Sequence, residues 1–180
     1  EIQSGIQFYD GITTAEIQEI LIRSASDLID LDHPNYQFVA ARLLLFATRK
    51  QLYGRMHETP TVRKHVEQCV ERGVYDAEIL DLYTEEEFEK LQSMIDHHRD
   101  YLFTYAGLRQ VVDKYLVQDR SSGTLYETPQ FMYLLIAATI FSKYPKETRL
   151  DYVKKYYDAI SRHKINIPTP IMAGVRTPLR

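Results

Sequence analysis

Thr14 and Lys50 have the residue types and the spacing that could bind a phosphate group. Apolar periodicity predicts one helix over residues 15–30 and another over residues 35–50, each roughly 24 Å long at about 1.5 Å per residue. Because only a short loop separates them, the helices should pack antiparallel, which returns Lys50 to the level of Thr14. The free N–H groups at the first helix start, the Thr14 hydroxyl and one or two cations from Arg49 and Lys50 could then converge on a phosphate.

The same residues also have a purely structural interpretation. Thr13 or Thr14 could simply cap the first helix, because Thr13-x-x-Glu16 has the form of a capping box. Lys50 could interact only with the negative end of its own helix dipole. From these residues alone, we favour the structural interpretation over the phosphate site.

A second group of side chains, Glu85–Glu87 followed by Asp96–Asp100, raises the hypothesis of a metal-carboxylate bundle enzyme. The spacing argues against it, because the sequence contains neither Glu-x-x-His nor His-Glu-x-x-His. Three glutamates after Thr84 are explained by their favourable interaction with a helix dipole. His98 falls on the apolar side of the helix predicted there, so we expect a hydrogen-bonded core histidine, with His97 pointing elsewhere.

The composition excludes several classes of protein. The net charge of -3 over 180 residues argues against a nucleic-acid partner, although nine Lys or Arg against three Asp or Glu follow residue 142. The single cysteine, Cys69, excludes an intrachain disulfide and cysteine zinc sites, and its register with valines predicts a core position. The longest apolar run, Phe131 to Phe141, is shorter than the about 20 residues of a membrane span, and no signal peptide is recognisable. We therefore expect no membrane partner and a cytoplasmic location.

Helical periodicity, capping signals and prolines predict a mainly α, helical bundle-like fold. Seven helices are expected: over residues 14–30, 35–52, 60–72, 84–102, 105–115 and 129–142, and a last one defined by Leu150, Val153, Tyr157 and Ile160 that does not extend beyond Lys164. Asp119–Gly123 between two short β-prone segments predicts one small β-hairpin, with strands over residues 115–118 and 124–127. Residues 165–180 contain three prolines and are predicted to be extended rather than helical.

Several sequence strings resemble the N-terminal region of the large, or alpha, subunit of class I ribonucleotide reductase of the enterobacterial type. The resemblance covers essentially the whole chain and is carried by residues 7–14, 38–43, 83–88, 114–118, 146–149 and above all the Pro-Thr-Pro-Ile-Met-Ala-Gly-Val-Arg-Thr-Pro string at 168–178. It implies a chain cut at both ends. Residues 1–54 would be the C-terminal helices of an ATP-cone regulatory domain, 55–164 a helical domain, and 165–180 an extended lead-in to a ten-stranded α/β barrel.

The resemblance also implies a function and site residues. The parent enzyme would reduce ribonucleoside diphosphates to deoxyribonucleoside diphosphates by a thiyl-radical mechanism, with its catalytic cysteines beyond Arg180, so this chain would hold no catalytic residue and be inactive alone. Thr14 and Lys50 match positions that bind the allosteric effectors ATP and dATP, whereas Gln18 replaces a histidine of the bacterial pattern. Thr169 matches a substrate-binding position, although its default role is a rigid surface turn.

The partners implied by the resemblance are a small radical-generating beta subunit that carries the metallocofactor, a second large subunit in a homodimer, and thioredoxin or glutaredoxin as reductant. No metal is expected in this chain. The alternative is a stand-alone helical interaction module of shared ancestry without catalysis. A cysteine soon after Arg180 in the reading frame would favour the reductase, and a stop codon would favour the module.

Overall fold

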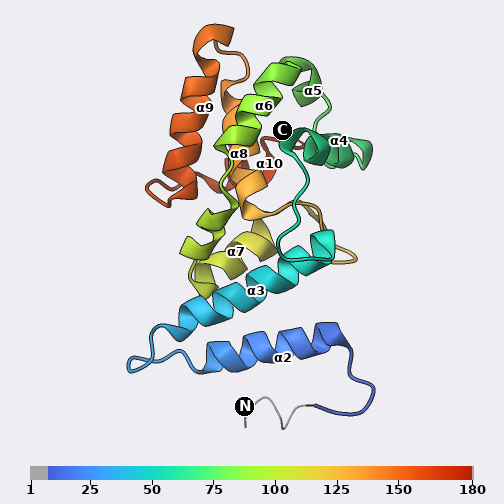
Figure 1. Cartoon of the computed structure of the whole chain (residues 1–180), viewed down its shortest axis with the longest axis vertical. Coiled ribbons are helices and arrows are strands. Elements are labelled where there is room, and N and C mark those ends of the chain that lie inside the picture. Colours follow the sequence, from blue (N-terminus) through green and yellow to red (C-terminus); the bar gives the residue numbers. More distant parts are fainter. Residues whose placement is uncertain (1–7, 180) are drawn as a thin grey trace.

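The computed structural model describes residues 8–179 and is mainly α-helical with one small hairpin, as predicted (Figure 1). Residues 1–7 and 180, which include the start of the expected cone segment and the end of the expected lead-in, lie outside the described residues. The elements in chain order are α2 (Thr14–Asp27), α3 (Tyr36–Tyr53), α4 (Val62–Glu71), α5 (Glu78–Leu82), α6 (Glu85–Met94), the 3-10 helix η1 (His97–Leu102), α7 (Tyr105–Lys114), β1 (Gln118–Asp119), β2 (Thr124–Leu125), α8 (Pro129–Phe141), α9 (Lys146–Ser161) and α10 (Thr169–Gly174).

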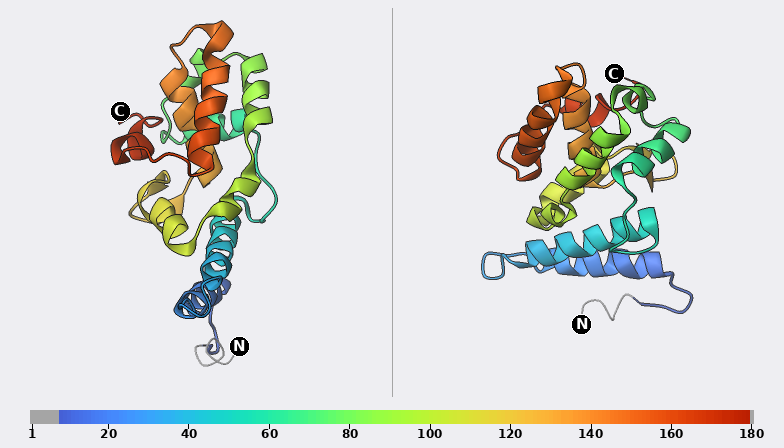
Figure 2. Two further views of the ribbon diagram at one scale, coloured as in Figure 1. Left: turned by 90° about the vertical axis from the view of Figure 1, so that its left-hand side faces the viewer. Right: turned by 45° about the horizontal axis from the view of Figure 1, so that its top comes forward.

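Helices α2 and α3 form the antiparallel pair that the sequence predicts, and they lie side by side at one end of the molecule (Figures 1 and 2). The capping box at the start of α2 is present, with the Thr13 hydroxyl accepting from the Glu16 N–H and the Glu16 carboxylate accepting from the Thr13 N–H. Ile22 of α2 is buried beside Leu44 and Leu45 of α3. Helix α3 also contacts α7, β2 and η1, so it connects the pair to the rest of the fold.

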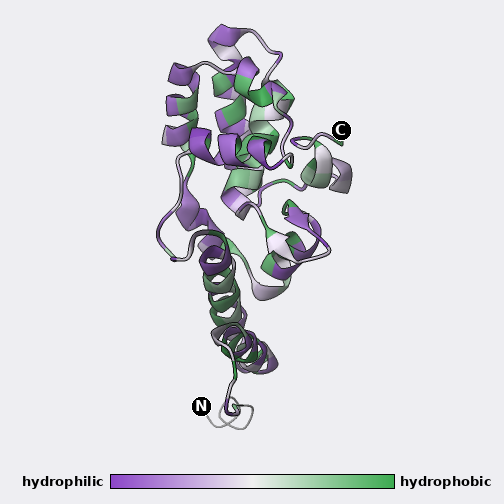
Figure 3. Cartoon of the chain, turned by 90° about the vertical axis from the view of Figure 1, so that its right-hand side faces the viewer, coloured by the Kyte–Doolittle hydropathy of each residue, from purple (hydrophilic) through white to green (hydrophobic). Residues whose placement is uncertain are grey.

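Helix α8 is the centre of the larger helical region. Every residue from Pro129 to Ala138 is buried, so this helix is apolar on nearly all sides and must be covered by others. It packs mainly against α9 and also contacts η1 and α10. Most of the helices contain both hydrophilic and hydrophobic residues, as Figure 3 shows, because each helix buries only one of its sides.

The hairpin between α7 and α8 is confirmed but shorter than predicted. Its strands pair antiparallel with Gln118 opposite Leu125 and Asp119 opposite Thr124. Gly123 has a φ of 72°, a left-handed conformation that glycine adopts without steric cost. The Asp119 carboxylate accepts hydrogen bonds from the hydroxyls of Ser121 and Ser122. The second strand of the hairpin, β2, packs against α3.

The helix that begins after Thr84 ends at Met94, which corrects the longer helix expected from the apolar spacing. Ile95 is extended, and the Asp96 carboxylate then accepts from the His98 N–H and starts the 3-10 helix. This break shifts the inward face by one position, so the prediction for the two histidines was wrong. His98 is exposed, whereas His97 points inward with its ring centroid 5.1 Å from that of Phe131.

Residues 169–174 form the short helix α10, so the prediction that the whole segment 165–180 is extended was wrong. Pro168 is the extended N-cap residue, and Pro170 occupies the first turn. A first-turn residue has no helical acceptor for its N–H, so proline costs no hydrogen bond there and its fixed φ suits a helix. The Met172 N–H closes this turn by donating to the Pro168 carbonyl at 3.1 Å.

A buried ion pair joins α9 to α6. The Arg149 guanidinium donates to both oxygens of Glu87, at 2.7 Å and 2.6 Å, and also to the carbonyls of Ser142 and Leu82. The hydrogen bonds from Arg149 lower the pKa of Glu87. The sequence placed Glu87 among the three glutamates that follow Thr84 but did not indicate its partner 62 residues away; Glu87 also closes the capping box with Thr84.

We expect Arg149→Met to reduce the free energy of unfolding by about 3 kcal/mol at pH 7, because it leaves a buried carboxylate without its partner. Since the folded-state pKa of Glu87 is depressed, this difference should persist above about pH 4.5 and shrink as the pH falls further. Lys90→Met is the matched control, because the exposed pair of Lys90 with Glu86 should contribute less than about 1 kcal/mol. Equal losses for both variants in urea unfolding would contradict this assignment.

The two buried ring nitrogens of His97 have no hydrogen-bond partner within residues 8–179. Burial, assisted by the Arg49 charge, lowers its pKa to about 4, so the folded state holds it neutral and loses stability as the pH falls below 6.5. We expect the decrease in the free energy of unfolding between neutral pH and pH 5 to be about 1–2 kcal/mol smaller in His97→Phe. His98→Gln, which changes the exposed neighbour, should leave the pH dependence of unfolding as it is.

Candidate functional site

A cleft of about 650 Å³ lies between the α2–α3 pair and the segment formed by α7 and the hairpin. Thr14, Gln18 and Lys50 all contribute to its lining, so the structure brings together the two positions that the helix lengths predicted to meet. The other polar and charged lining residues are Glu19, Thr48, Gln51, Arg109, Asp113 and Gln118, and the apolar walls include Ile22, Leu44, Ala47, Val112 and Leu125.

Thr14 is not the helix cap. Thr13 holds that position, and Thr14 is the first residue of α2, so the capping role that competed with ligand binding belongs to its neighbour. Thr14 is exposed and Gln18, one turn later, is half-buried. The start of α2 therefore presents a hydroxyl and an amide to the cleft, next to the positive end of the helix dipole.

Lys50 is half-buried in the last turn of α3, where its charge also suits the negative end of that helix. The cleft contains one further cation, Arg109, whose Nε lies 3.1 Å from an Asp113 oxygen. In the part of the chain that the structure describes, Lys50 has no carboxylate partner within ion-pair distance. Its charge is thus available to an anionic ligand, and the apolar walls could contact an uncharged part of the same molecule.

Arg49 takes no part in this cleft, contrary to the expectation that it could supply a second cation. Its guanidinium is buried on the other side of α3, where it donates to the Asp100 carboxylate at 3.0 Å. It also donates to the carbonyls of Met56 and His97. Adjacent helix positions point about 100° apart, so Lys50 and Arg49 serve different sites.

No local sequence pattern indicates the buried partners of Arg49. Asp100 accepts from Arg49 and from Gln130 of α8, whose own carbonyl oxygen accepts from the Tyr157 hydroxyl at 2.7 Å. Burial raises the pKa of Asp100 even though these hydrogen bonds oppose the shift. This chain of contacts links α3, η1, α8 and α9.

Thr169 lies far along the chain from the residues of the cleft and belongs to a separate candidate site. It is the first residue of α10, is exposed, and has its Oγ1 3.4 Å from the Tyr115 hydroxyl. It does not line the cleft of Thr14 and Lys50. Sequence reasoning placed it correctly between two rigid prolines but expected no helix after it.

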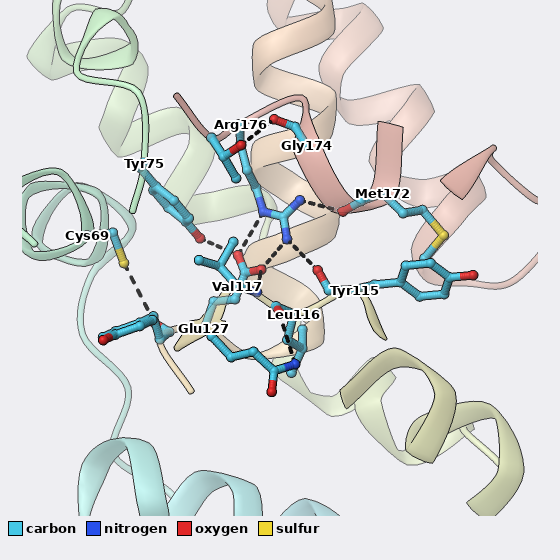
Figure 4. A network of polar contacts seen from close by, with 12 residues as sticks. Cys69, Tyr75, Tyr115, Leu116, Val117, Glu127, Met172, Gly174 and Arg176 are labelled. Atoms are coloured by element: carbon cyan, nitrogen blue, oxygen red, sulfur yellow. Dashed lines mark hydrogen bonds and ion pairs between the residues drawn. The ribbon is translucent and has the colours of Figure 1, made fainter. Parts of the chain in front are cut away.

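Beneath α10 lies a buried polar network that sequence reasoning missed (Figure 4). Arg176 and Glu127 form an ion pair with both side chains fully buried. The Tyr75 hydroxyl also donates to Glu127, and the His65 ring lies 3.0 Å from the same hydroxyl. Each of these groups comes from a different segment of the chain.

Cys69 is a core residue, as its register with valines predicts. It is 1% exposed, and burial raises the pKa of its thiol to about 12. A thiol with this pKa stays protonated near neutral pH and is a poor nucleophile.

The metal hypothesis finds no support in the geometry. Within residues 8–179, no group of three or more His, Cys, Asp or Glu side chains is arranged to hold a metal ion. None of the helices in that range is both long and apolar enough to cross a lipid bilayer.

The comparisons with known proteins agree on one family. Residues 101–180 match the family model described as the ribonucleotide reductase all-alpha domain. The whole chain is 54% identical to ribonucleoside-diphosphate reductase 1 subunit alpha of Escherichia coli K12 and covers 24% of that protein's length. It is also 54% identical over its whole length to the corresponding subunit of Haemophilus influenzae, and 45% identical to that of Enterobacteria phage T4, with 24% of each relative covered. The chain thus spans about a quarter of the length of these relatives.

Proposed function

The chain belongs to the ribonucleotide reductase alpha-subunit family, and we propose that it is part of a subunit that reduces ribonucleoside diphosphates to deoxyribonucleoside diphosphates. The observation that carries this proposal is the 54% identity to a ribonucleoside-diphosphate reductase alpha subunit over all 180 residues. A match of this extent includes the helical region and both candidate binding positions. The proposed activity is that of the complete subunit, since this chain offers only the buried, protonated Cys69 for thiol chemistry.

The cleft between the α2–α3 pair and the segment formed by α7 and the hairpin is proposed to bind the allosteric effectors ATP and dATP. Three features support this role: the Thr14 hydroxyl at a helix start, the unpaired charge of Lys50, and apolar walls that could contact a base or sugar. Gln18 shares the lining and would contribute an amide in place of the histidine that the resemblance leads one to expect. An amide can donate and accept hydrogen bonds but carries no charge at any pH.

Thr169 is proposed to bind the ribonucleoside diphosphate substrate. Its exposure at the start of α10 leaves its N–H and hydroxyl accessible. Its position between Pro168 and Pro170 limits backbone motion, so little conformational freedom is lost on binding.

The proposal includes the partners that this activity requires. A separate small beta subunit would generate the radical with its own metal centre, the alpha subunits would form a homodimer, and thioredoxin or glutaredoxin would supply electrons. We place the complete enzyme in the cytoplasm. The direct test is reduction of CDP to dCDP by the complete alpha subunit together with its beta subunit. Absence of this activity in the reconstituted pair, with both proteins folded, would contradict the proposal.

For the effector cleft, we expect Lys50→Ala in the complete alpha subunit to weaken inhibition by dATP by about tenfold or more. The reason is the loss of a charge-assisted contact to phosphate, which contributes about 1.5–3 kcal/mol. Turnover without dATP should be largely unchanged. Lys155→Ala, on the exposed side of α9, is the control, and dATP should inhibit this variant as strongly as the original enzyme. Unchanged dATP sensitivity in Lys50→Ala would refute the assignment of the cleft.

For the substrate position, we expect Thr169→Ala to raise KM for the ribonucleoside diphosphate, because it removes one hydroxyl contact of about 0.5–1.5 kcal/mol. Thr169→Ser keeps the hydroxyl, so its KM should be close to that of the original enzyme. Steady-state kinetics of the complete enzyme measure both. If KM and kcat are the same in the alanine variant, Thr169 does not bind substrate.

A further inference from the structure

Arg176 is the central residue of the network beneath α10 (Figure 4). Its side chain is fully buried, and its guanidinium donates to three residues. Nε and Nη2 donate to the two oxygens of Glu127, Nη1 donates to the Met172 carbonyl at 2.6 Å, and Nη2 donates also to the Tyr115 carbonyl at 3.0 Å. A planar guanidinium offers its donors in fixed directions, so these acceptors are held in a fixed relation to one another.

Glu127 is held as firmly as Arg176. Besides the guanidinium, its carboxylate accepts from the Val117 N–H at 2.7 Å and from the Tyr75 hydroxyl. The Arg176 backbone is fixed too, because its carbonyl accepts from the Asp76 N–H at 3.0 Å. The carboxylate and guanidinium are thus satisfied by groups on four segments, which is the condition for a buried ion pair to be tolerated.

Two of the acceptors of Arg176 lead to Thr169. The first is Met172, whose carbonyl accepts from Arg176 and whose N–H donates to the Pro168 carbonyl, directly before Thr169. The second is Tyr115, whose carbonyl accepts from Arg176 and whose hydroxyl lies 3.4 Å from Thr169 Oγ1. The contact through Met172 fixes the backbone of α10. The contact through Tyr115 fixes the position of the hydroxyl that lies nearest to the Thr169 hydroxyl.

We propose that Arg176 and Tyr115, with Glu127 as counterion, are positioning residues that orient Thr169 for substrate binding. This inference rests on the proposed role of Thr169 in binding the ribonucleoside diphosphate. Neither positioning residue needs to touch the substrate. Arg176 sets the place of α10, and the Tyr115 hydroxyl sets the rotamer of the Thr169 side chain.

The Tyr115 part of the inference allows the sharpest test, because removal of one half-exposed hydroxyl leaves the core intact. In the complete alpha subunit assayed with its beta subunit, Tyr115→Phe should raise KM for CDP about three- to tenfold and change kcat much less. Tyr152→Phe, at an exposed tyrosine of α9, is the matched control and should leave KM as it is.

A double-mutant cycle separates positioning from an independent effect. On a Thr169→Ala background, Tyr115→Phe should have no further effect on KM, because the hydroxyl that it orients is gone. Additive effects of the two substitutions would overturn the inference. The failures are distinguishable: an unchanged KM in Thr169→Ala refutes the substrate site itself, whereas a raised KM in Thr169→Ala with none in Tyr115→Phe refutes only the positioning role.

For Arg176, a truncation to Ala would leave Glu127 charged and buried, so the informative variant is Arg176→Lys. It keeps the charge but loses the forked geometry that serves Met172 and Tyr115 together. We expect a raised KM for CDP with dATP inhibition unchanged. Arg149→Lys is the control for a buried arginine without a link to α10, and it should lower thermal stability without changing KM. Equal KM values for the two lysine variants would contradict the role of Arg176.

Discussion

The structure depends on the requirement that a charge removed from water be paired. Three arginines within residues 8–179, Arg49, Arg149 and Arg176, are buried, and each donates to a carboxylate and to backbone carbonyls. Because an unpaired buried charge costs several kcal/mol, each pair permits only the arrangement of helices that keeps both partners together. The apolar core around α8 supplies the driving force for folding, but it would tolerate many small shifts of the helices. The ion pairs exclude those shifts.

Each pair connects segments that lie far apart in the sequence. Arg149 and Glu87 join α9 to α6, and Arg176 and Glu127 join the segment after α10 to the segment between the hairpin and α8. The third pair, Arg49 with Asp100, joins α3 to η1. Arg49 directly precedes Lys50 in the sequence, so this pair anchors the helix that lines the candidate effector cleft in the larger helical region. A ligand that moved α3 would have to move this buried contact as well, which gives the cleft a physical connection to η1 and α8.

The two candidate sites are built in different ways. The cleft of Thr14 and Lys50 lies between a helix pair and the segment formed by α7 and the hairpin. Thr14, Gln18 and Lys50 are exposed or half-buried there. Thr169 belongs to a short helix whose position is fixed by a fully buried network. The first arrangement leaves room for adjustment to an effector, whereas the second holds a single hydroxyl in a rigid setting. This difference agrees with the regulatory role proposed for the first site and the substrate recognition proposed for the second.

Local patterns in the sequence determined much of this protein. Capping boxes at Thr13 and Thr84, the hairpin at residues 119–123 and the uniformly apolar α8 were all predictable, because hydrogen bonds and periodicity within a few residues specify them. The antiparallel meeting of Thr14 and Lys50 followed from helix length and a short loop. The family resemblance came from sequence strings alone.

Only the tertiary structure decided the rest. It placed Arg49 in the core and left Lys50 in the cleft, and it turned His97 rather than His98 inward, because a break at Ile95 shifted the register. It also selected Glu127 as the partner of Arg176, 49 residues away. No local rule pairs one charge with another across such a distance, since the choice depends on which groups the folded core removes from water together.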